Sequence, residues 1–263
     1  MSEENINYQT KSNPLFGDLL WSRPENKQHA GKLLIIGGNK FSFNSPAEAY
    51  NEAERAGAGA IRVILPDSLR TTISKIFPAA DFAPSNPSGG LSNAALAEIT
   101  EQMAWANCTL LSGDFGHNSE TAVLIEKIVS SKDMLVIAGD AVDSFLLSPG
   151  SIINRENLLI TLNFQKLQKI STHLKIERPL TSMMPIQLLI DAIREISTKY
   201  RAIVELEHEN RIYIGYKGSV SVTEITKDAN LENKVAAHSS VWWMQNPSKP
   251  FEALTSSLID FAV

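Results

Sequence analysis

The sequence has little of what would assign it to a specialised class of protein. Its 263 residues include one cysteine, Cys108, so no disulfide can form within the chain and a reducing, cytoplasmic setting is expected. No apolar run approaches the ~18 residues of a membrane-spanning helix, and residues 1–14 are too polar and acidic for a secretory signal. Basic residues (24) are outnumbered by acidic ones (29), and the net charge of −5 argues against binding to nucleic acid or an anionic membrane. A globular cytoplasmic protein is therefore expected.

Short motifs that carry metal or nucleotide chemistry are missing as well. The sequence contains neither the GxxxxGK[ST] phosphate loop nor a GxGxxG turn that opens a helix after a strand. Its histidines lack metal-ligand spacing, so no metal site is expected. They are His29, His117, His173, His208 and His238. Cys108 lies within an apolar stretch, which predicts an inert core residue instead of a reactive thiol.

What the sequence does contain is a regular alternation of apolar strands and helices. The run Lys32–Ile36 ends in two glycines, as a buried parallel strand entering a tight turn does, and Ile61–Leu65 is a second such run. Between them, Ser45, Pro46 and Glu48 have the pattern of a helix start, with the serine as its cap. Together these segments predict a βαβ unit.

The same alternation continues to the end of the chain. Further strands are expected at 108–111, 134–138, 158–162, 202–206, 211–215 and 220–224, the last three partly antiparallel, and further helices at 93–104, 119–129, 165–170, 185–198, 234–244 and 250–261. Residues 1–17 lack this periodicity and are expected to form a mobile arm or a segment that docks on a neighbour. The prediction is one doubly wound α/β domain, residues 18–263, with a mostly parallel central sheet and helices on both faces.

Polar residues and glycines gather where four of the predicted strands end. They are Gly37, Gly38 and Asn39, then Ser112–Gly116, then Gly139 and Asp140, then Thr161 and Asn163. The carboxyl ends of parallel strands share one edge of a sheet, where ligands of such folds bind, so these turns predict a pocket. Glycine also serves any sharp turn between a strand and a helix. Asp114 and Asp140 are candidate catalytic acid–base or metal-water groups, and each is equally compatible with a solvated turn residue.

One stretch of the sequence is similar to a known family. HAGKLLIIGGN at His29–Asn39, followed by RAGAG at Arg55–Gly59, resembles the HKG…VLVIGGS…RAGAG stretch of the ADP- or ATP-dependent NAD(P)H-hydrate dehydratases, which belong to the ribokinase-like superfamily. Later segments match in register with the family's VIGPGLG, LDADAL, TPHPGEFARL and PxEA segments, and they are Leu110–Gly116, Ile137–Val142, Thr161–Ile170 and Glu252-Ala253. The resemblance covers roughly residues 18–260, and the amino-terminal half is its specific part.

The resemblance implies a ribokinase-like fold with its pocket at the strand ends. Members of the family repair hydrated NADH and NADPH, and they consume ADP or ATP, with magnesium, in the dehydration. In the family, the nucleotide phosphates rest on a GSGD turn at a helix N-terminus, and the aspartate serves proton transfer. Members commonly form homo-oligomers, and the same is expected of this chain. The residues implied for substrate binding are Gly37, Gly38, Asn39, Ser45, Gly116 and Asn163.

The phosphate turn of the family is replaced in this chain. Its slot holds Leu231-Glu232-Asn233-Lys234, so the glycines that let a backbone approach phosphate are missing, and Glu232 adds a negative charge. Lys234 stands in place of the aspartate, and an ammonium group cannot act as a general base at neutral pH. Asn233 is expected to cap the helix that follows. Asn233 and Lys234 are the remaining candidates for contact with a nucleotide cofactor.

Other positions of the family pattern are altered too. Ala138 replaces the first aspartate of LDADAL, whereas Asp140 keeps the second. In the TPHPGE segment, Asn163 replaces the histidine and Lys166 the glutamate. Near a later strand that contacts nucleotide in the family, Glu207-His208 stands where the family has Lys-Gly. The scaffold resembles the family, whereas the phosphate site does not.

Two hypotheses about function remain open. The altered motifs favour a degenerate member, catalytically impaired, that acts by binding a nucleotide or nicotinamide ligand or by assembling with a partner subunit. The alternative is an active ADP- or ATP-dependent dehydratase or small-molecule kinase with a remodelled site. An enzyme with another reaction would use Asp114 or Asp140.

Overall fold

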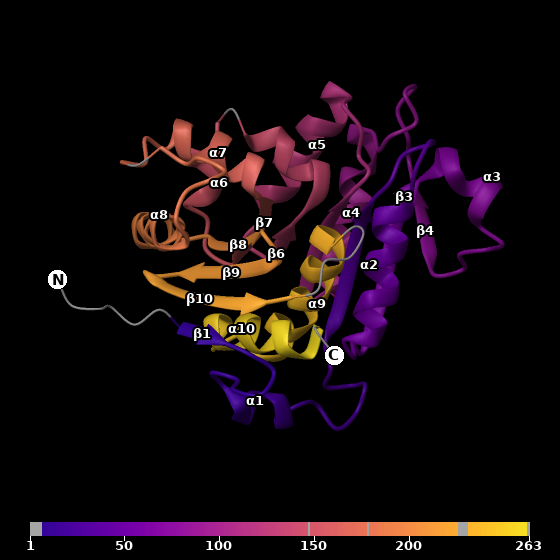
Figure 1. Ribbon diagram of the computed structural model, residues 1–263. Coiled ribbons are helices and arrows are strands. Elements are labelled where there is room, and N and C mark those ends of the chain that lie inside the picture. Colours follow the sequence, from indigo (N-terminus) through magenta and orange to yellow (C-terminus); the bar gives the residue numbers. More distant parts are fainter. Residues whose placement is uncertain (1–6, 147, 178, 226–230, 262–263) are drawn as a thin grey trace.

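A ten-stranded sheet runs through the computed structural model, which describes residues 7–146, 148–177, 179–225 and 231–261 (Figure 1). The strands lie in the order β1-β10-β9-β8-β7-β6-β5-β2-β3-β4, and within these residues β9 alone is antiparallel to its neighbours. They are β1 (Asn7–Gln9), β2 (Lys32–Gly37), β3 (Ala60–Pro66), β4 (Ala80–Ala83), β5 (Cys108–Gly113), β6 (Leu135–Ile137), β7 (Leu158–Asn163), β8 (Ile203–His208), β9 (Arg211–Tyr216) and β10 (Ser219–Glu224). The expected, mostly parallel sheet is confirmed.

Helices cover both faces of this sheet. One face carries α2 (Asn44–Arg55), α9 (Leu231–Gln245) and α10 (Pro250–Phe261), with α2 beside α9 in Figure 1. The other face carries α4 (Leu96–Trp105), α5 (Ser119–Val129), α6 (Gly150–Ile153), α7 (Phe164–His173) and α8 (Ile186–Lys199). Short helices complete the chain: α1 (Gly17–Trp21), α3 (Arg70–Ile73) and the single-turn or 3-10 segments Asp67–Leu69, Asn93–Ala95 and Gly139–Phe145. Of the helices in the described part of the chain, none is long and apolar enough to cross a membrane.

Two hydrophobic cores lie on either side of the sheet. Leu33 and Ile35 of β2 pack in the core under α2, α9 and α10, whereas Leu34 and Ile36 pack in the core under α4 to α8. Successive side chains of a strand point to opposite faces, so an unbroken apolar strand fills both cores. This explains why the central strands read as continuous apolar runs, and it confirms the doubly wound α/β prediction. Cys108 is buried in the core under α2, α9 and α10, and burial raises its pKa to about 12.

The start of α2 differs from the predicted helix start. The helix begins at Asn44, and Ser45 does not cap it. Instead, one carboxylate oxygen of Asp114, in the loop after β5, accepts the Ser45 N–H at 2.9 Å and the Ser42 hydroxyl at 2.8 Å. An acidic group at a helix N-terminus accepts hydrogen bonds from the free N–H groups and interacts favourably with the positive end of the helix dipole. A side chain 69 residues away has taken the place of the local cap.

The predicted cap of α9 is also wrong. The helix already includes Leu231, so Asn233 lies inside its first turn and does not precede the helix. Residues 226–230, directly before it, lie outside the described residues. The sequence pattern placed the start late because α9 is buried on nearly all sides and therefore has no polar face to mark its limits.

Part of the predicted arm belongs to the sheet. Asn7–Gln9 form β1, which pairs in parallel with β10 at one edge. The Gln9 side chain is buried and donates to the Thr223 hydroxyl at 2.7 Å and to the Thr255 carbonyl at 2.6 Å. Hydrogen bonds of the side chain therefore hold this short, polar strand to β10 and α10, with little apolar burial of its own. Residues 1–6 of the arm lie outside the described residues.

The direction of winding reverses between β2 and β5. From β2 the chain moves outward to β3 and β4, then returns to place β5 on the other side of β2 and continues through β6, β7 and β8. In open parallel sheets, ligands bind outside the carboxyl ends of the strands at such a reversal. The turns that the sequence singled out after β2 and β5 flank it.

Candidate functional site

Hydrogen bonds join the four predicted turns and the start of α9 at the carboxyl edge of the sheet. The turn after β2 reaches the turn after β5 through Asn39, whose amide donates to the Asp114 carbonyl at 2.7 Å. The Gly38 N–H also donates to the Gly113 carbonyl at 3.0 Å. The turn after β5 reaches the turn after β6 through Asp140. The turns therefore converge as expected, and contacts between them cross the reversal point.

Both candidate catalytic carboxylates bind backbone N–H groups of neighbouring loops. Asp114 holds the start of α2, as described above. Asp140 accepts the Phe115 N–H at 3.1 Å and the Gly116 N–H at 2.9 Å, one with each oxygen. Burial raises the pKa of Asp140, and these two hydrogen bonds oppose the rise. The geometry gives each aspartate a structural task in shaping the turn after β5.

The turn glycines touch each other, and Asn233 covers them. Gly113 and Gly139 both have positive φ angles, 107° and 59°, and a Cβ on Gly139 would lie 3.0 Å from the Gly113 Cα. The amide of Asn233 donates to the Ser45 hydroxyl at 3.0 Å, and its Oδ1 is buried without a hydrogen-bond partner among the described residues. That oxygen would lie 3.2 Å from the same Cβ. The Asn233 Oδ1, a hydrogen-bond acceptor, therefore lies directly against Gly113 and Gly139.

Glu232 provides an internal anion for the same edge. Its Oε1 accepts the Gly139 N–H at 3.0 Å and the Lys166 ammonium at 2.8 Å, and Lys166 also donates to the Gly139 carbonyl at 2.7 Å. The two side chains are 15% and 13% exposed, so water screens this ion pair only in part. Glu232 is also in the first turn of α9, where the helix dipole favours an anion. A carboxylate of the chain holds the donors that a bound anion would use.

These contacts do not fit a nucleotide phosphate. A backbone N–H, an ammonium group and a helix N-terminus are good phosphate ligands, but here they face the carboxylate of Glu232. A phosphate at this position would meet that carboxylate and the unpartnered Oδ1 of Asn233. Both groups are acceptors and repel an anion. Glu232, the Gly139 N–H and Lys166, together called the Glu232 cradle, therefore bind one another and do not fit the phosphate of ADP or ATP.

The remaining predicted residues have local roles at this edge. Asn163 caps α7, because its Oδ1 accepts the Lys166 N–H at 3.0 Å. The Asn39 side chain also closes its own turn by accepting the Phe41 N–H at 2.8 Å. Gly37 packs so close to Gly113 that a Cβ would lie 2.4 Å from its carbonyl oxygen. Lys234 is half-buried in the first turns of α9.

Sequence reasoning missed the Glu232–Lys166 pair, although a signal was present. Against the family pattern, Lys166 replaces a glutamate and Glu232 enters a turn of small residues. Each change alone only removes a residue of that pattern. Taken together they place opposite charges in the first turns of α7 and α9, and such a pair of opposite charges indicates a contact.

Below this edge, α9 carries a second buried set of charges. His238 is 1% exposed, its Nδ1 lies 2.6 Å from Glu52 of α2, and its Nε2 lies 3.1 Å from Asp260 of α10 without the alignment of a hydrogen bond. Burial opposes ionisation of both carboxyl groups, yet their contacts with His238, and with Arg55 and Arg23 respectively, leave the pKa of each below its usual value. This network holds α2, α9 and α10 together.

Glu205 is a further buried acid under the same helix. Its two oxygens accept the Thr161 hydroxyl at 2.8 Å and the Ser239 hydroxyl at 2.6 Å. Complete burial raises its pKa to about 7, although both hydroxyl contacts lower it. Ser239 therefore lies in the core with Glu205 and does not reach the helix start. Sequence reasoning had no signal for this pair, whose members are 34 residues apart.

The comparisons with known sequences give no relative. No protein-family model matches the chain, and no curated protein matches it in sequence. What similarity there is lies in the fold.

Solved structures superpose over nearly the whole chain. A ribokinase-like superfamily protein from Enterococcus faecalis has a TM-score of 0.73 at 16% identity, over 99% of this chain and 88% of that one. A hypothetical protein from Streptococcus mutans has a TM-score of 0.69 at 16% identity, over 90% and 83%. The ADP/ATP-dependent NAD(P)H-hydrate dehydratase of Bacillus subtilis, co-crystallised with ATP and Mg²⁺, has a TM-score of 0.66 at 10% identity, over 97% and 86%. At such identities the likeness concerns architecture alone, and by that measure this chain has the ribokinase-like α/β fold.

Proposed function

We propose that the chain is a catalytically degenerate protein of ribokinase-like fold that acts by binding or assembly, without ADP- or ATP-dependent dehydration or phosphoryl transfer. The observation that carries this proposal is the Glu232 carboxylate, which accepts from both the Gly139 N–H and the Lys166 ammonium. The site is filled by the chain's own anion.

The physical argument rests on what such chemistry needs from a protein. Catalysis of phosphoryl transfer consists almost entirely of positioning the phosphates and neutralising their charge. At this edge, the Glu232 carboxylate and the Asn233 Oδ1 lie where a phosphate would bind beside Gly139. The carboxylates of Asp114 and Asp140 accept N–H groups of the loops. Groups that support the reaction elsewhere are used here to hold loops together.

A second function has one observation in its favour. Lys166 and the Gly139 N–H would bind a phosphate if the Glu232 side chain moved away, and the Bacillus subtilis dehydratase of similar fold was crystallised with ATP and Mg²⁺. On this alternative the chain is an active dehydratase or small-molecule kinase with a remodelled site, and Glu232 is displaced by the ligand.

Calorimetric titration with ATP·Mg²⁺ and ADP·Mg²⁺ separates the two functions. It is performed on the wild-type chain, on Lys166→Met, and on Lys169→Met, which changes an exposed lysine of the same helix. We expect no heat that depends on Lys166. A micromolar signal that is lost in Lys166→Met and kept in Lys169→Met contradicts the degenerate function and favours the enzyme.

The proposal extends to assembly and location. A degenerate protein of this fold is expected to act in the cytoplasm and as a homo-oligomer. Light scattering of the purified chain measures its mass against the 28.9 kDa of one copy. If the measured mass is that of a monomer at every concentration tested, the homo-oligomer part of the proposal is contradicted. The proposal then rests on ligand binding alone.

A further inference from the structure

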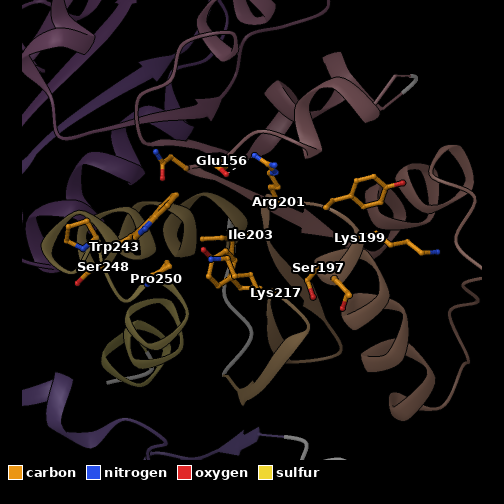
Figure 2. Close-up of a pocket in the computed structure, with 14 residues that line it drawn as sticks. Glu156, Ser197, Lys199, Arg201, Ile203, Lys217, Trp243, Ser248 and Pro250 are labelled. Atoms are coloured by element: carbon orange, nitrogen blue, oxygen red, sulfur yellow. Dashed lines mark hydrogen bonds and ion pairs between the residues drawn. The ribbon is translucent and has the colours of Figure 1, made fainter.

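A cavity of about 610 Å³ opens at the opposite, amino-terminal edge of the sheet (Figure 2). Its walls come from four places: Glu156 and Asn157 before β7, residues 197–203 from the end of α8 to the start of β8, the turn between β9 and β10, and the connection from α9 to α10. The volume lies in the range of 300–1,000 Å³ typical of small-molecule sites. None of the residues that the sequence singled out as a site lines it.

The charge of the cavity is opposite to that of the chain. Lys199, Arg201 and Lys217 line it together with a single acid, Glu156, whereas the whole chain has a net charge of −5. Arg201 pairs with Glu156 at 2.7 Å, and both are well exposed. Lys199 pairs with Glu195 and, in Figure 2, points away from the other labelled side chains. One cation, Lys217, has no carboxylate partner among the described residues.

The backbone fixes the position of Lys217. Tyr216 and Ser219 pair across the two-residue turn that joins β9 to β10, and Lys217 and Gly218 fill it with φ angles of 47° and 81°. The Gly218 N–H donates to the Ser197 hydroxyl at 3.3 Å, which ties the turn to α8. The Lys217 ammonium lies 5.0 Å from the centre of the Tyr216 ring. This cation is therefore held at the cavity wall.

The other side of the cavity is apolar and flat. Trp243, Pro250 and Ile203 contribute to it, and Figure 2 shows Trp243 and Pro250 on the α9–α10 side with Ile203 and Lys217 between them and α8. Trp243 and Ile203 are each only 2% exposed, so the rings that a planar group can pack against are those of Pro250 and Tyr216, which are both partly exposed. A polar wall with an unpaired cation and an apolar wall with rings thus face a common space.

We propose that this cavity binds a small organic anion, in which a phosphate or carboxylate is attached to a planar ring. The anion contacts Lys217, and the ring packs between the partly exposed rings of Tyr216 and Pro250. The site depends on residues of the amino-terminal edge alone, and it is therefore independent of the Glu232 cradle and of the function proposed above.

The test uses 1-naphthyl phosphate as the probe, with calorimetric titration into the full chain. The decisive variant is Lys217→Asn, because asparagine adopts positive φ readily and Asn-Gly suits a two-residue turn. Lys175→Asn is the matched control, since Lys175 is an exposed lysine with a φ of 52° that does not line the cavity. We expect submillimolar binding to the wild type and to the control, weakened about fivefold in Lys217→Asn.

Two simpler probes separate the contributions of anion and ring. Inorganic phosphate and 1-naphthol each carry one half of the recognised group, and both should bind more weakly than 1-naphthyl phosphate. No binding of 1-naphthyl phosphate at millimolar concentration, or equal affinity in Lys217→Asn and the wild type, overturns the proposal. Because Lys166→Met reports on the carboxyl edge and Lys217→Asn on the amino edge, either proposal can fail while the other holds.

Discussion

The two edges of the sheet use their polar groups in opposite ways. At the carboxyl edge, Asp114, Asp140 and Glu232 each accept backbone N–H groups of neighbouring segments. Each of these three carboxylates therefore has a structural task. At the amino edge, Lys217 lines a cavity of about 610 Å³ and has no carboxylate partner in the part of the chain that the structure describes. In open parallel sheets, ligands bind at the carboxyl edge. In this chain, the cavity described above lies at the amino edge. Architecture alone therefore does not locate the site.

The function proposed above implies that the carboxyl edge has changed from a binding edge to a structural one. Each donor that would bind a ligand keeps its place, but a side chain of the same protein satisfies it. Glu232 acts in this way towards Gly139 and Lys166. Such replacement preserves the strand-end turns and satisfies their donors within the chain. The four predictions below test this contrast, beginning with the largest expected effect.

The buried acid beneath the closed edge should give the largest effect. The pKa of Glu205 in the folded chain, about 7, lies above its ordinary value of 4.5, so its contribution to stability is present below pH 4.5 and is lost as pH rises through 7. The stability of the wild type relative to Glu205→Gln should fall by on the order of 3 kcal/mol between pH 4.5 and 8. Urea unfolding at several pH values measures this difference. Glu224→Gln, at an exposed strand end, should show no such trend, and a flat difference for Glu205→Gln would contradict the burial argument.

Removing Asp140 should loosen the carboxyl edge. Asp140→Ala leaves the Phe115 and Gly116 N–H groups without their acceptor, and we expect a loss of about 2 kcal/mol in the free energy of unfolding. Asp143→Ala, in the same 3-10 segment but exposed, should change it by less than about 0.5 kcal/mol. If Asp140 instead serves catalysis, its variant will lose a turnover that the wild type shows, and the structural assignment fails.

Removing the internal anion should reopen the cradle. Glu232→Ala leaves the Gly139 N–H without an acceptor and the Lys166 ammonium without its carboxylate partner, with a loss of about 1–2 kcal/mol in the free energy of unfolding. Inorganic phosphate should then restore stability by binding the folded state, and thermal unfolding with and without phosphate measures this effect. Glu252→Ala, which removes the acid from the first turn of α10, is the control. Equal phosphate responses in the two variants would mean that Glu232 does not occupy an anion site.

The smallest effect belongs to the open edge. Lys217→Asn should leave stability unchanged or raise it by a few tenths of a kcal/mol, since asparagine fits the positive φ of this turn better than lysine does. Thermal unfolding of the variant beside Lys175→Asn measures it. A clear loss of stability would show that the lysine holds the hairpin together, and the contrast between a structural edge and an open edge would then disappear.

Most of the framework follows from the sequence because its signals are local. Apolar runs such as Lys32–Ile36 and helix segments such as Ser119–Val129 carry their period within themselves, and the structure confirms both. Short polar elements do not: β1 at Asn7–Gln9 is held by side-chain contacts to residues more than 200 positions away. The four residues of β4 are too few to show a pattern.

The candidate site is predictable only as a place. Turn residues such as Gly38 and Gly139 locate the edge, because the carboxyl ends of parallel strands must meet there. What fills the edge depends on pairs such as Lys166 with Glu232, whose members are 66 residues apart. The cavity at the other edge has walls from four separate segments, none with a recognisable motif. Contacts of this kind arise from packing in three dimensions, which a local pattern does not encode.

The position of β1 sets an order on synthesis. Gln9 binds Thr223 and Thr255, 214 and 246 residues later in the chain. At roughly 5–20 residues per second, a ribosome takes about 10 s or longer to make the partners after the strand itself has appeared. During that interval β1 lacks the strand with which it pairs in the fold, and the outer edge of β10 is covered only when this earlier segment returns to it. Closure of this flank therefore joins segments that leave the ribosome more than 200 residues apart.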